Sequence, residues 1–399
     1  MVGGFELKKV EESSARRCVA LLKEGASETH ARVTVELEDA PPHRIAKLDL
    51  QQVETPEAVR PARLSEAEAI AGLRAQIDAA VAADKFSGAV LVAKNGKPIF
   101  TDVRGMADRE AKVPITLESR FRIGSMNKMF TATAVMQLVQ ARKIALDDTV
   151  GKLLPDYPNK EVASKVTVHH LLGHAGGTGD IFGPEYRQRK GELRTIQDYV
   201  KLYGERAPLF EPGSRFEYSN YGFILLGAII EKVTGKSYYE RVQSAVFAPA
   251  GMKRTSSPPE EKNEPGRVVP YTHFGSPKAW ARESTLLPYR GASAGGGDST
   301  VTDLLAFANA LGAHKLLDAK HTELLTTRKD DKHGYAYGFE DYTNDKDGVR
   351  CIGHGGGAPG MNGDLRICTS GYTVAVLSNF DPRAADLLAH WLVPRLPAK

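Results

Sequence analysis

The segment that says most about the fold runs from Arg122 to Arg142 and reads RIGSMNKMFTATAVMQLVQAR. It contains no proline, and no glycine after Gly124. Its apolar side chains recur at steps of three and four residues: Met129, Ala132, Val135, Met136 and Val139. This spacing predicts a mostly buried helix. Ser125 stands where that helix begins.

Ser125 and Lys128 are three residues apart, so one helical turn brings their side chains to the same side. A serine at a helix start often only caps the helix, because its oxygen accepts an amide proton of the first turn. A buried lysine, however, loses hydration and its pKa falls, and a neutral amine can take the proton from a serine hydroxyl. Ser125 is the only serine followed by lysine three residues later. The pair is our candidate nucleophile and base.

Composition sets the class of protein. The 399 residues are 42% hydrophobic and 26% charged, which is ordinary for a globular chain with one large core or two domains. A formal charge of +4 over 53 basic and 49 acidic residues is too balanced for a nucleic-acid surface. There is no apolar run of membrane-spanning length, and the first nine residues lack the apolar core of an export signal. We expect no nucleic acid and no membrane span, and leave the compartment open.

Three cysteines, Cys18, Cys351 and Cys368, are too few for a disulfide scaffold, and they form no Cys-x-x-Cys pair. We therefore expect chemistry without a metal or cofactor. Cys351 and Cys368 lie on two consecutive expected strands. If these strands pair about the loop between them, a disulfide is possible, but we favour two buried free thiols because isolated cysteines are commonly core residues.

The N-terminal part of the chain has three strand-like runs, at residues 17–22, 31–37 and 44–50, which predict a small antiparallel meander within residues 5–49. A linker follows, with prolines at Pro41, Pro42, Pro56 and Pro61. Ser65 and Glu68 then form a capping box that opens an amphipathic helix extending to about Val81. We predict residues 1–61 as a β-rich accessory segment with its linker, and residues 62–399 as the main domain.

The main domain begins with two strand-like runs, 88–94 and 97–103, joined by the hairpin signal Asn95-Gly96. Helical patterns follow at 167–174, 193–203, 220–233, 237–247 and from Thr300 onward. Strands return at 349–353, 363–368 and 372–377, before a helix at 382–392. Strands at both ends with helices between predict an α+β fold, in which an antiparallel sheet from both ends carries a helical insert.

Two further constellations carry chemistry. Tyr218-Ser219-Asn220 stands at the foot of an apolar helix. The glycine-rich run from Gly353 to Gly360 contains His354 and follows an expected strand. We expect this run to form a loop whose backbone amides a ligand can approach closely.

Together, Ser125-x-x-Lys128, Tyr218-x-Asn220 and His354-Gly355-Gly356 resemble the serine β-lactamase and penicillin-binding-protein superfamily, over roughly residues 66–399. Within it, the chain is similar to the branch of class C β-lactamases, DD-peptidases, D-aminopeptidases and family VIII carboxylesterases. The N-terminal strands lie outside the resemblance and look like the last part of a small α+β accessory domain.

The resemblance implies a β-lactamase-like fold and a role for each matching residue. Ser125 would be the acylated nucleophile and Lys128 its base or proton relay. Tyr218 would assist as a base, and Asn220 would orient the carbonyl side of the substrate. Backbone amides of Ser125 and Gly357 would form the oxyanion hole.

The same resemblance makes His354, Gly355 and Gly356 substrate-binding residues. His354 stands where relatives carry lysine or histidine. Gly355 departs from the pattern, because many relatives that bind a substrate carboxylate carry threonine or serine there.

Two competing motifs deserve comparison. Gly291-Ala292-Ser293-Ala294-Gly295 fits the Gly-x-Ser-x-Gly nucleophile elbow, but neither the buried strand before it nor the helix directly after it is present in the sequence pattern. His170 and His174 have the i, i+4 spacing of zinc ligands, but no acidic third ligand follows. We expect neither motif to carry the chemistry.

These residues predict a serine hydrolase that forms an acyl-enzyme, with small carboxylic esters as the first choice of substrate. Amide hydrolysis is the alternative, as a DD-peptidase, a D-aminopeptidase or a weak β-lactamase. A non-catalytic penicillin-binding sensor is the alternative from another class, but it needs no complete proton-transfer set. The partner is a small ester or amide, and the oligomeric state is left open.

Overall fold

The structure is a computed structural model that describes residues 4–25, 30–53, 60–262, 264–275, 279–283, 286–342 and 348–399. They form two compact units. The first contains the chain up to Asp78 together with Leu387–Pro397, and the second contains Ala79–Asp386 and the last two residues. We describe each unit by itself. The boundary expected near residue 62 stays a prediction, and Pro56 of the expected linker lies outside the described residues.

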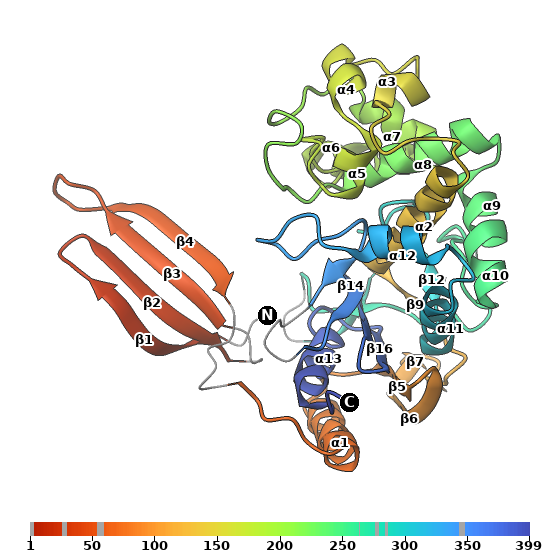
Figure 1. Cartoon of the computed structure of the whole chain (residues 1–399). Helices are drawn as coiled ribbons and strands as arrows, with labels where there is room; N and C mark the ends of the chain where they lie inside the picture. The colour runs from red at the N-terminus through yellow and green to blue at the C-terminus, as the bar shows by residue number, and fades with distance from the viewer. Residues whose placement is uncertain are drawn as a thin grey trace. The chain divides into compact units, whose positions relative to one another are not determined.

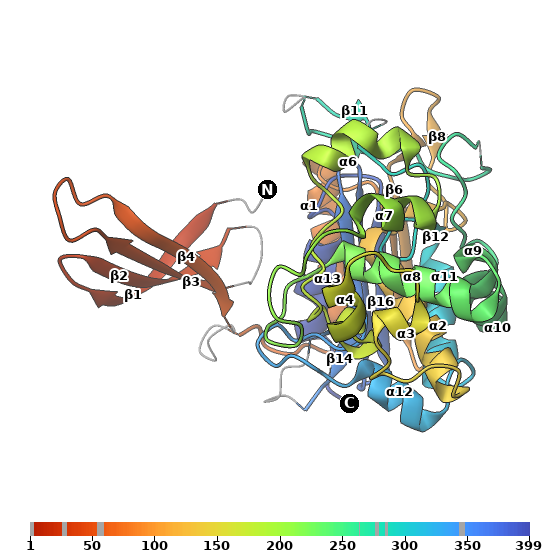
Figure 2. The ribbon, with the colours of Figure 1, turned by 90° about the horizontal axis from the view of Figure 1, so that it is seen from above.

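The first unit contains the expected meander, with a first strand that the sequence analysis did not predict. Strands β1 (Phe5–Ser13), β2 (Arg17–Glu24), β3 (His30–Leu37) and β4 (Ile45–Val53) pair antiparallel in chain order (Figure 2). Helix α1 (Glu66–Ala82) begins with the predicted capping box, since the Ser65 amide donates to Glu68 Oε2 at 2.9 Å. A Cβ on Gly72 would lie 2.3 Å from the Trp391 ring, so α1 packs closely on α13 (Asp386–Leu392).

The second unit is built on a six-stranded antiparallel sheet of order β13-β14-β15-β16-β5-β6. The bounds are β13 Glu340–Asp341, β14 Cys351–Ala358, β15 Met361–Cys368, β16 Tyr372–Ser378, β5 Gly88–Lys94 and β6 Lys97–Arg104. The turn between β5 and β6 has positive φ at Asn95 and Gly96, as the hairpin signal requires. Strand β16 pairs with β5, which joins the two ends of the unit and confirms the predicted α+β fold.

The middle part of this unit's sequence is mostly helical. In Figure 1 the helices from α3 to α8 gather at one end, and β5, β6, β14 and β16 at the other. The helix bounds are α2 Asn127–Gln140, α3 Val150–Leu153, α4 Lys160–Lys165, α5 Val168–Leu172, α6 Pro184–Arg189, α7 Ile196–Tyr203, α8 Asn220–Thr234, α9 Tyr238–Val242, α10 Ala248–Ala250, α11 Val301–Gly312 and α12 Ala319–Thr326. The short strands are β7 Met106–Asp108, β8 Val113–Pro114, β9 Phe121–Arg122, β10 Tyr271–Thr272, β11 Ala281–Arg282 and β12 Asp298–Ser299.

Helix α2 is the buried helix that its apolar spacing predicts. Phe130 is fully buried and packs edge-to-face against Phe247 and Phe307, with ring centroids 5.1 and 4.8 Å apart. The helix begins at Asn127, however, and no side chain caps it. Ser125 lies in a 3₁₀ turn, Gly124–Met126, that precedes the helix. Ser125 is therefore not the cap, and its hydroxyl is available for other contacts.

The glycine-rich residues 353–360 do not form the loop that the sequence predicted. We expected a loop at residues 353–360, but these residues continue strand β14 as far as Ala358, and the turn is confined to Pro359 and Gly360. A Cβ on Gly353 would lie 1.7 Å from Leu365 O, and one on Gly356 would lie 2.0 Å from Ile123 O. The glycines therefore let the neighbouring strand and the turn before Ser125 approach β14 backbone to backbone.

The cysteines also correct an expectation. We favoured free thiols for Cys351 and Cys368, but they form a disulfide, while Cys18 is free. Strands β14 and β15 pair so that Cys351 lies directly opposite Cys368, with the Cα atoms 4.0 Å apart. The cross-strand register, which depends on where the turn falls, decides this pairing.

Candidate active site

The turn that carries Ser125 is held by backbone contacts on two sides. The Ile123 amide donates to Gly297 O at 3.1 Å, and the Gly296 amide donates to Gly124 O at 3.0 Å. Gly124 has a φ of +52°, and a Cβ there would lie 3.0 Å from Gly357 N. A side chain at this position would be strained and crowded, so glycine lets β14 pass beside Ser125. Ser125 itself is partly exposed, as a group that meets a substrate must be.

Lys128 lies in the first turn of α2 and is fully buried. Its Nζ is 3.3 Å from Ser125 Oγ and 2.8 Å from Asn220 Oδ1, and it also donates to Ala294 O. The last two atoms can only accept hydrogen bonds. A neutral amine thus satisfies both with its two hydrogens and turns its lone pair toward the Ser125 hydroxyl.

The protonation of Lys128 follows from its surroundings. Burial lowers the pKa of this amine to about 7, although Asp180 and Glu340 act in the opposite direction. A large share of the amine is therefore neutral near pH 7. This is the condition that a general base for serine requires.

Tyr218 completes the group around Ser125, whose hydroxyl is close enough to affect the pKa of the phenol. Its ring lies over the Lys128 amine, with Nζ 4.7 Å from the ring centroid. Burial raises the pKa of the phenol, more than its interaction with the Ser125 side chain lowers it. Tyr218 is therefore a neutral phenol that can both accept and donate a proton.

Asn220 opens helix α8 just after the Ser219 cap, whose Oγ accepts from the Gly222 amide at 2.9 Å. The Asn220 amide group bridges two partners, because Oδ1 accepts from Lys128 and Nδ2 donates to Asp180 Oδ2 at 2.8 Å. Asp180 thus fixes which way the Asn220 amide points. Sequence reasoning missed Asp180, and no spacing in the chain marks it.

The glycine strand supplies the remaining candidates. Because a Cβ on Gly124 would lie 3.0 Å from Gly357 N, the Gly357 amide nitrogen lies beside the turn of Ser125, and its role in an oxyanion hole stays a prediction. Gly355 differs from its neighbours, since a Cβ there would meet nothing closer than Gly363 O at 3.8 Å. A side chain at Gly355 has room, whereas one at Gly356 has none.

His354 is 2% exposed, and both of its ring nitrogens have partners inside the protein. Nε2 lies 3.1 Å from the Tyr335 hydroxyl, and Nδ1 lies 2.5 Å from Gly355 O and 3.8 Å from Glu340 Oε1. Burial and the Lys128 charge lower the pKa of this imidazole, while Glu340 raises it. The structure therefore gathers Ser125, Lys128, Tyr218, Asn220, His354 and the glycines 355–357 around the start of α2.

The two competing motifs have structural roles. Ser293 is fully buried, and its hydroxyl has no hydrogen-bond partner among the described residues. Its loop closes on itself, because Ala292 and Gly295 exchange two backbone hydrogen bonds. His174 Nδ1 accepts from the Ser219 amide, and His170 Nδ1 accepts from the Thr167 amide. In the described part of the chain no three His, Cys, Asp or Glu side chains gather as metal ligands would.

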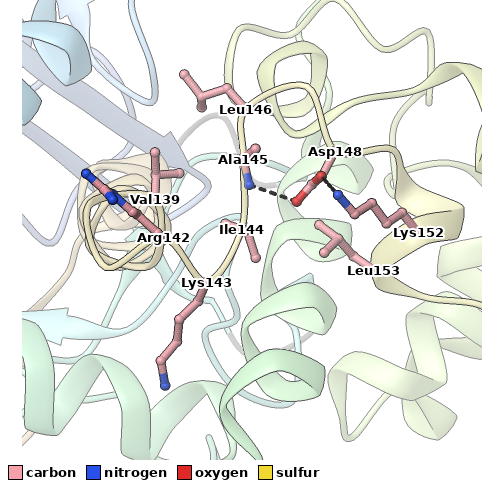
Figure 3. Close-up of a pocket in the computed structure, with 9 residues that line it drawn as sticks. All are labelled: Val139, Arg142, Lys143, Ile144, Ala145, Leu146, Asp148, Lys152 and Leu153. Carbon is pink, nitrogen blue, oxygen red and sulfur yellow. Dashed lines mark hydrogen bonds and ion pairs between the residues drawn. The ribbon is translucent and has the colours of Figure 1, made fainter.

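Figure 3 shows a separate cavity of about 530 Å³ beyond the end of α2. Its lining residues are Val139, Arg142, Lys143, Ile144, Ala145, Leu146, Asp148, Lys152 and Leu153. Asp148 accepts from the Ala145 amide at 2.8 Å and pairs with Lys152, so its charge is neutralised within the protein. None of the predicted site residues lines this cavity, and we assign it no part in the chemistry.

Within the described ranges, no helix is both long and apolar enough to cross a membrane.

Comparison with known proteins gives concordant results. The family model described as Beta-lactamase matches residues 73–397. Penicillin-binding protein 4* of Bacillus subtilis (strain 168) is 29% identical over 296 residues, which cover 70% of this chain and 64% of that protein. Esterase EstB of Burkholderia gladioli is 34% identical over 233 residues, which cover 54% of this chain and 57% of EstB. The matches thus span less than two thirds of these two relatives.

Among solved structures, the penicillin binding protein from Bacillus halodurans superposes with a TM-score of 0.71 at 30% identity, covering 78% of this chain and 98% of that one. The chain therefore belongs to the β-lactamase family, within the superfamily of β-lactamases and penicillin-binding proteins.

Proposed function

We propose that this chain hydrolyses small carboxylic esters through a covalent acyl-enzyme on Ser125. The observation that carries the proposal is the buried Lys128 amine, whose pKa is about 7 and whose Nζ lies 3.3 Å from Ser125 Oγ. Burying a lysine without a paired carboxylate is costly. A non-catalytic binding module gains nothing from this cost, whereas a nucleophilic serine needs the neutral amine beside it.

In the first step, Ser125 Oγ forms a bond to the ester carbonyl carbon, and its proton passes to Lys128 Nζ. The carbonyl π electrons move to oxygen, which becomes an oxyanion facing the backbone amides of Ser125 and Gly357. Each such donor commonly contributes about 3 to 4 kcal/mol to the transition state. Asn220, held by Asp180, orients the carbonyl side of the substrate.

In the second step, the carbon–oxygen bond to the alcohol breaks. The proton on Lys128 travels through the Tyr218 hydroxyl to the departing alkoxide, and Tyr218 ends as the neutral phenol that its raised pKa favours. Water then attacks the acyl-enzyme, giving its proton back along the same route. The carboxylic acid leaves, and Ser125 regains its proton.

The preference for esters rests on Gly355 and His354. A penicillin or a peptidyl-D-alanine terminus carries a carboxylate, which binds well only where the site supplies charge-assisted hydrogen bonds. Gly355 has no side chain to donate one, and the two His354 nitrogens already have partners within the protein. An uncharged ester needs neither group. The similarity to an esterase supports this choice, and the similarity to penicillin-binding proteins supports the amide alternative.

The experiment is a substrate panel of p-nitrophenyl esters, a chromogenic cephalosporin and D-amino-acid amides, with Ser125→Ala as the blank. We expect kcat/KM for the best ester to exceed that for the cephalosporin by at least about tenfold, the value of one lost charged hydrogen bond. If an amide or the cephalosporin is the better substrate, the ester assignment is wrong. Acylation by penicillin without turnover of any substrate would instead indicate a sensor.

A further inference from the structure

A chain of buried hydrogen bonds passes next to Tyr218 and joins four segments of the protein. The Ser219 amide donates to His174 Nδ1 at 3.1 Å, and His174 Nε2 lies 3.0 Å from the Tyr335 hydroxyl. The same hydroxyl lies 3.1 Å from His354 Nε2. All three rings are at most 3% exposed. These hydrogen bonds therefore link the start of α8, the segment after α5, the segment between α12 and β13, and strand β14.

Each hydrogen in this chain is fixed by the one before it. A backbone amide can only donate, so His174 Nδ1 is an acceptor and the neutral ring carries its proton on Nε2. That proton points at the Tyr335 oxygen, which leaves the single Tyr335 hydrogen for His354 Nε2. His354 is then protonated on Nδ1, which faces Gly355 O. The two histidines carry opposite tautomers.

The hydrogen-bond chain also fixes the position of the Tyr218 ring. The Tyr218 ring packs against His174 with centroids 4.2 Å apart, and its edge-to-face neighbour is Tyr335 at 6.3 Å. The Ser219 amide that His174 accepts from belongs to the residue directly after Tyr218. His174 thus fixes both the backbone and the ring at this point, and Tyr335 fixes His174.

The hydrogen-bond chain opposes a positive charge on His354. The groups that face this ring are Lys128, Tyr218, Tyr335, Glu340 and Asp364. A second proton on His354 would place two N–H groups against the Tyr335 oxygen and leave the Tyr335 hydrogen buried without an acceptor. Leaving a buried donor unpaired is costly, so the neutral ring is favoured.

We propose that Tyr335 is a positioning residue, which through His174 and His354 fixes the ring of Tyr218 and keeps His354 neutral. The effect of Tyr335 on catalysis rests on the proposed function of Ser125, Lys128 and Tyr218. The tautomers of His174 and His354 do not depend on that function, because they follow from hydrogen bonds alone.

The first test is histidine NMR on the unaltered protein labelled with nitrogen-15. Long-range proton–nitrogen spectra separate the two neutral tautomers from each other and from the charged ring. We expect the Nε2–H form for His174 and the Nδ1–H form for His354, both unchanged between about pH 5.5 and 8, where a free histidine titrates. The same tautomer on both rings, or titration of either ring in this range, overturns the proposal. This readout stands even if no ester is hydrolysed.

The second test compares Tyr335→Phe with Tyr337→Phe. Tyr337 is the matched control, since it is equally buried, lies two residues away and bonds its hydroxyl to another histidine, His169. We expect Tyr335→Phe to lower kcat by about tenfold to a hundredfold with KM nearly unchanged, as misplacement of a catalytic group does. Its pH profile should gain a second titration, from His354. The control should stay within about twofold of the unaltered protein.

Equal kinetics and equal pH profiles in the two variants would contradict the proposal. If Tyr335→Phe fails to fold, the tautomers in the unaltered protein still decide the matter. If the unaltered protein hydrolyses no ester while the tautomers are as expected, the proposed function is wrong and the hydrogen-bond chain stands.

Discussion

Two serines lie within sequence motifs of nucleophiles, and their surroundings differ in every respect that matters for catalysis. Ser125 is partly exposed and has the amine of Lys128 3.3 Å from its hydroxyl. Ser293 is fully buried, and its hydroxyl has no partner in the described structure. A nucleophile needs a base within reach and a path for substrate. Only Ser125 has both.

The two regions nevertheless work together. The loop around Ser293 turns its carbonyl groups toward the start of α2, where Ala292 O accepts from Asn127 and Ser293 O accepts from Thr131. Ala294 O accepts from Lys128, so this loop helps to set the orientation of the base. The comparison shows that the Gly-x-Ser-x-Gly stretch contributes its backbone and not its hydroxyl.

The largest expected effect separates the two serines directly. Ser125→Ala should remove nearly all ester turnover, since losing the nucleophile leaves at most about a thousandth of the rate. Ser293→Ala should stay within about twofold, because it deletes a buried hydroxyl without a partner. The measurement is kcat/KM on the best p-nitrophenyl ester, with the folded state of each variant checked by thermal unfolding. Full activity in Ser125→Ala would refute the assignment.

The next effect concerns the base beside Ser125. Lys128→Ala and Tyr218→Phe should each lower kcat/KM by about a hundredfold or more, the usual size of a proton-transfer contribution. In the unaltered protein the amine is active when neutral and its pKa is about 7. Thus kcat/KM should fall with decreasing pH below about 7, and level off above about 8. A flat profile between pH 5 and 8 would exclude Lys128 as the base.

Protein stability offers an independent check of the same pKa. Between about pH 7 and 10 this lysine is protonated in the unfolded chain and neutral in the folded chain. The free energy of unfolding therefore increases with rising pH, by at most about 1.4 kcal/mol per pH unit. Lys128→Met removes this contribution. The stability of the unaltered protein relative to Lys128→Met should therefore rise from pH 7 to 9, and an equal difference at both pH values would contradict the lowered pKa.

A smaller effect tests substrate choice near Ser125. Gly355→Thr adds a hydroxyl where a Cβ has room, and should shift the ratio of cephalosporin to ester turnover toward the cephalosporin by about tenfold, the value of one charge-assisted hydrogen bond. Gly356→Ala is the contrasting variant, since its Cβ would meet Ile123 O at 2.0 Å and should disturb both activities together. An unchanged ratio in Gly355→Thr would mean that another position sets the preference.

The smallest effect tests the supporting role of the Ser293 loop. Thr131→Val removes the hydroxyl that donates to Ser293 O at 2.8 Å and contacts the Tyr238 hydroxyl at 2.8 Å. The free energy of unfolding should fall by about 1 to 3 kcal/mol, the cost of buried groups left unpaired. Turnover should change only a few-fold, because no catalytic contact is lost. Urea unfolding and ester kinetics on the same preparation measure both, and a large loss of turnover without loss of stability would contradict the supporting role.

Local patterns were sufficient to predict much of the fold. The meander, the capping box at Ser65 and the Asn95-Gly96 hairpin are all determined by neighbouring residues, and the structure confirms them. The pairing of β16 with β5 follows from the same strands at both ends of the unit. The glycine strand and the disulfide did not follow, because both depend on the register of β14 against β15 and on the approach of a turn far away in sequence.

The residues of the candidate site likewise include some that the sequence predicted and some that it did not. Ser125, Lys128, Tyr218 and Asn220 stand in short motifs whose residue types reveal their chemistry. Asp180 acts only through a contact made in the folded chain, and nothing local marks it. His174 entered the sequence analysis as a possible zinc ligand and not as a partner of Tyr218, and no sequence motif drew attention to Tyr335.

The central claim is that Ser125 becomes acylated, and trapping the intermediate tests it most directly. The protein is treated with a fluorophosphonate or mixed briefly with an activated ester, and the adduct is located by peptide mass spectrometry, with Ser125→Ala as the control. We predict one adduct per chain, on the peptide that carries Ser125, and none in the control. An adduct on Ser293, or ester turnover with no covalent adduct on Ser125, would contradict the account.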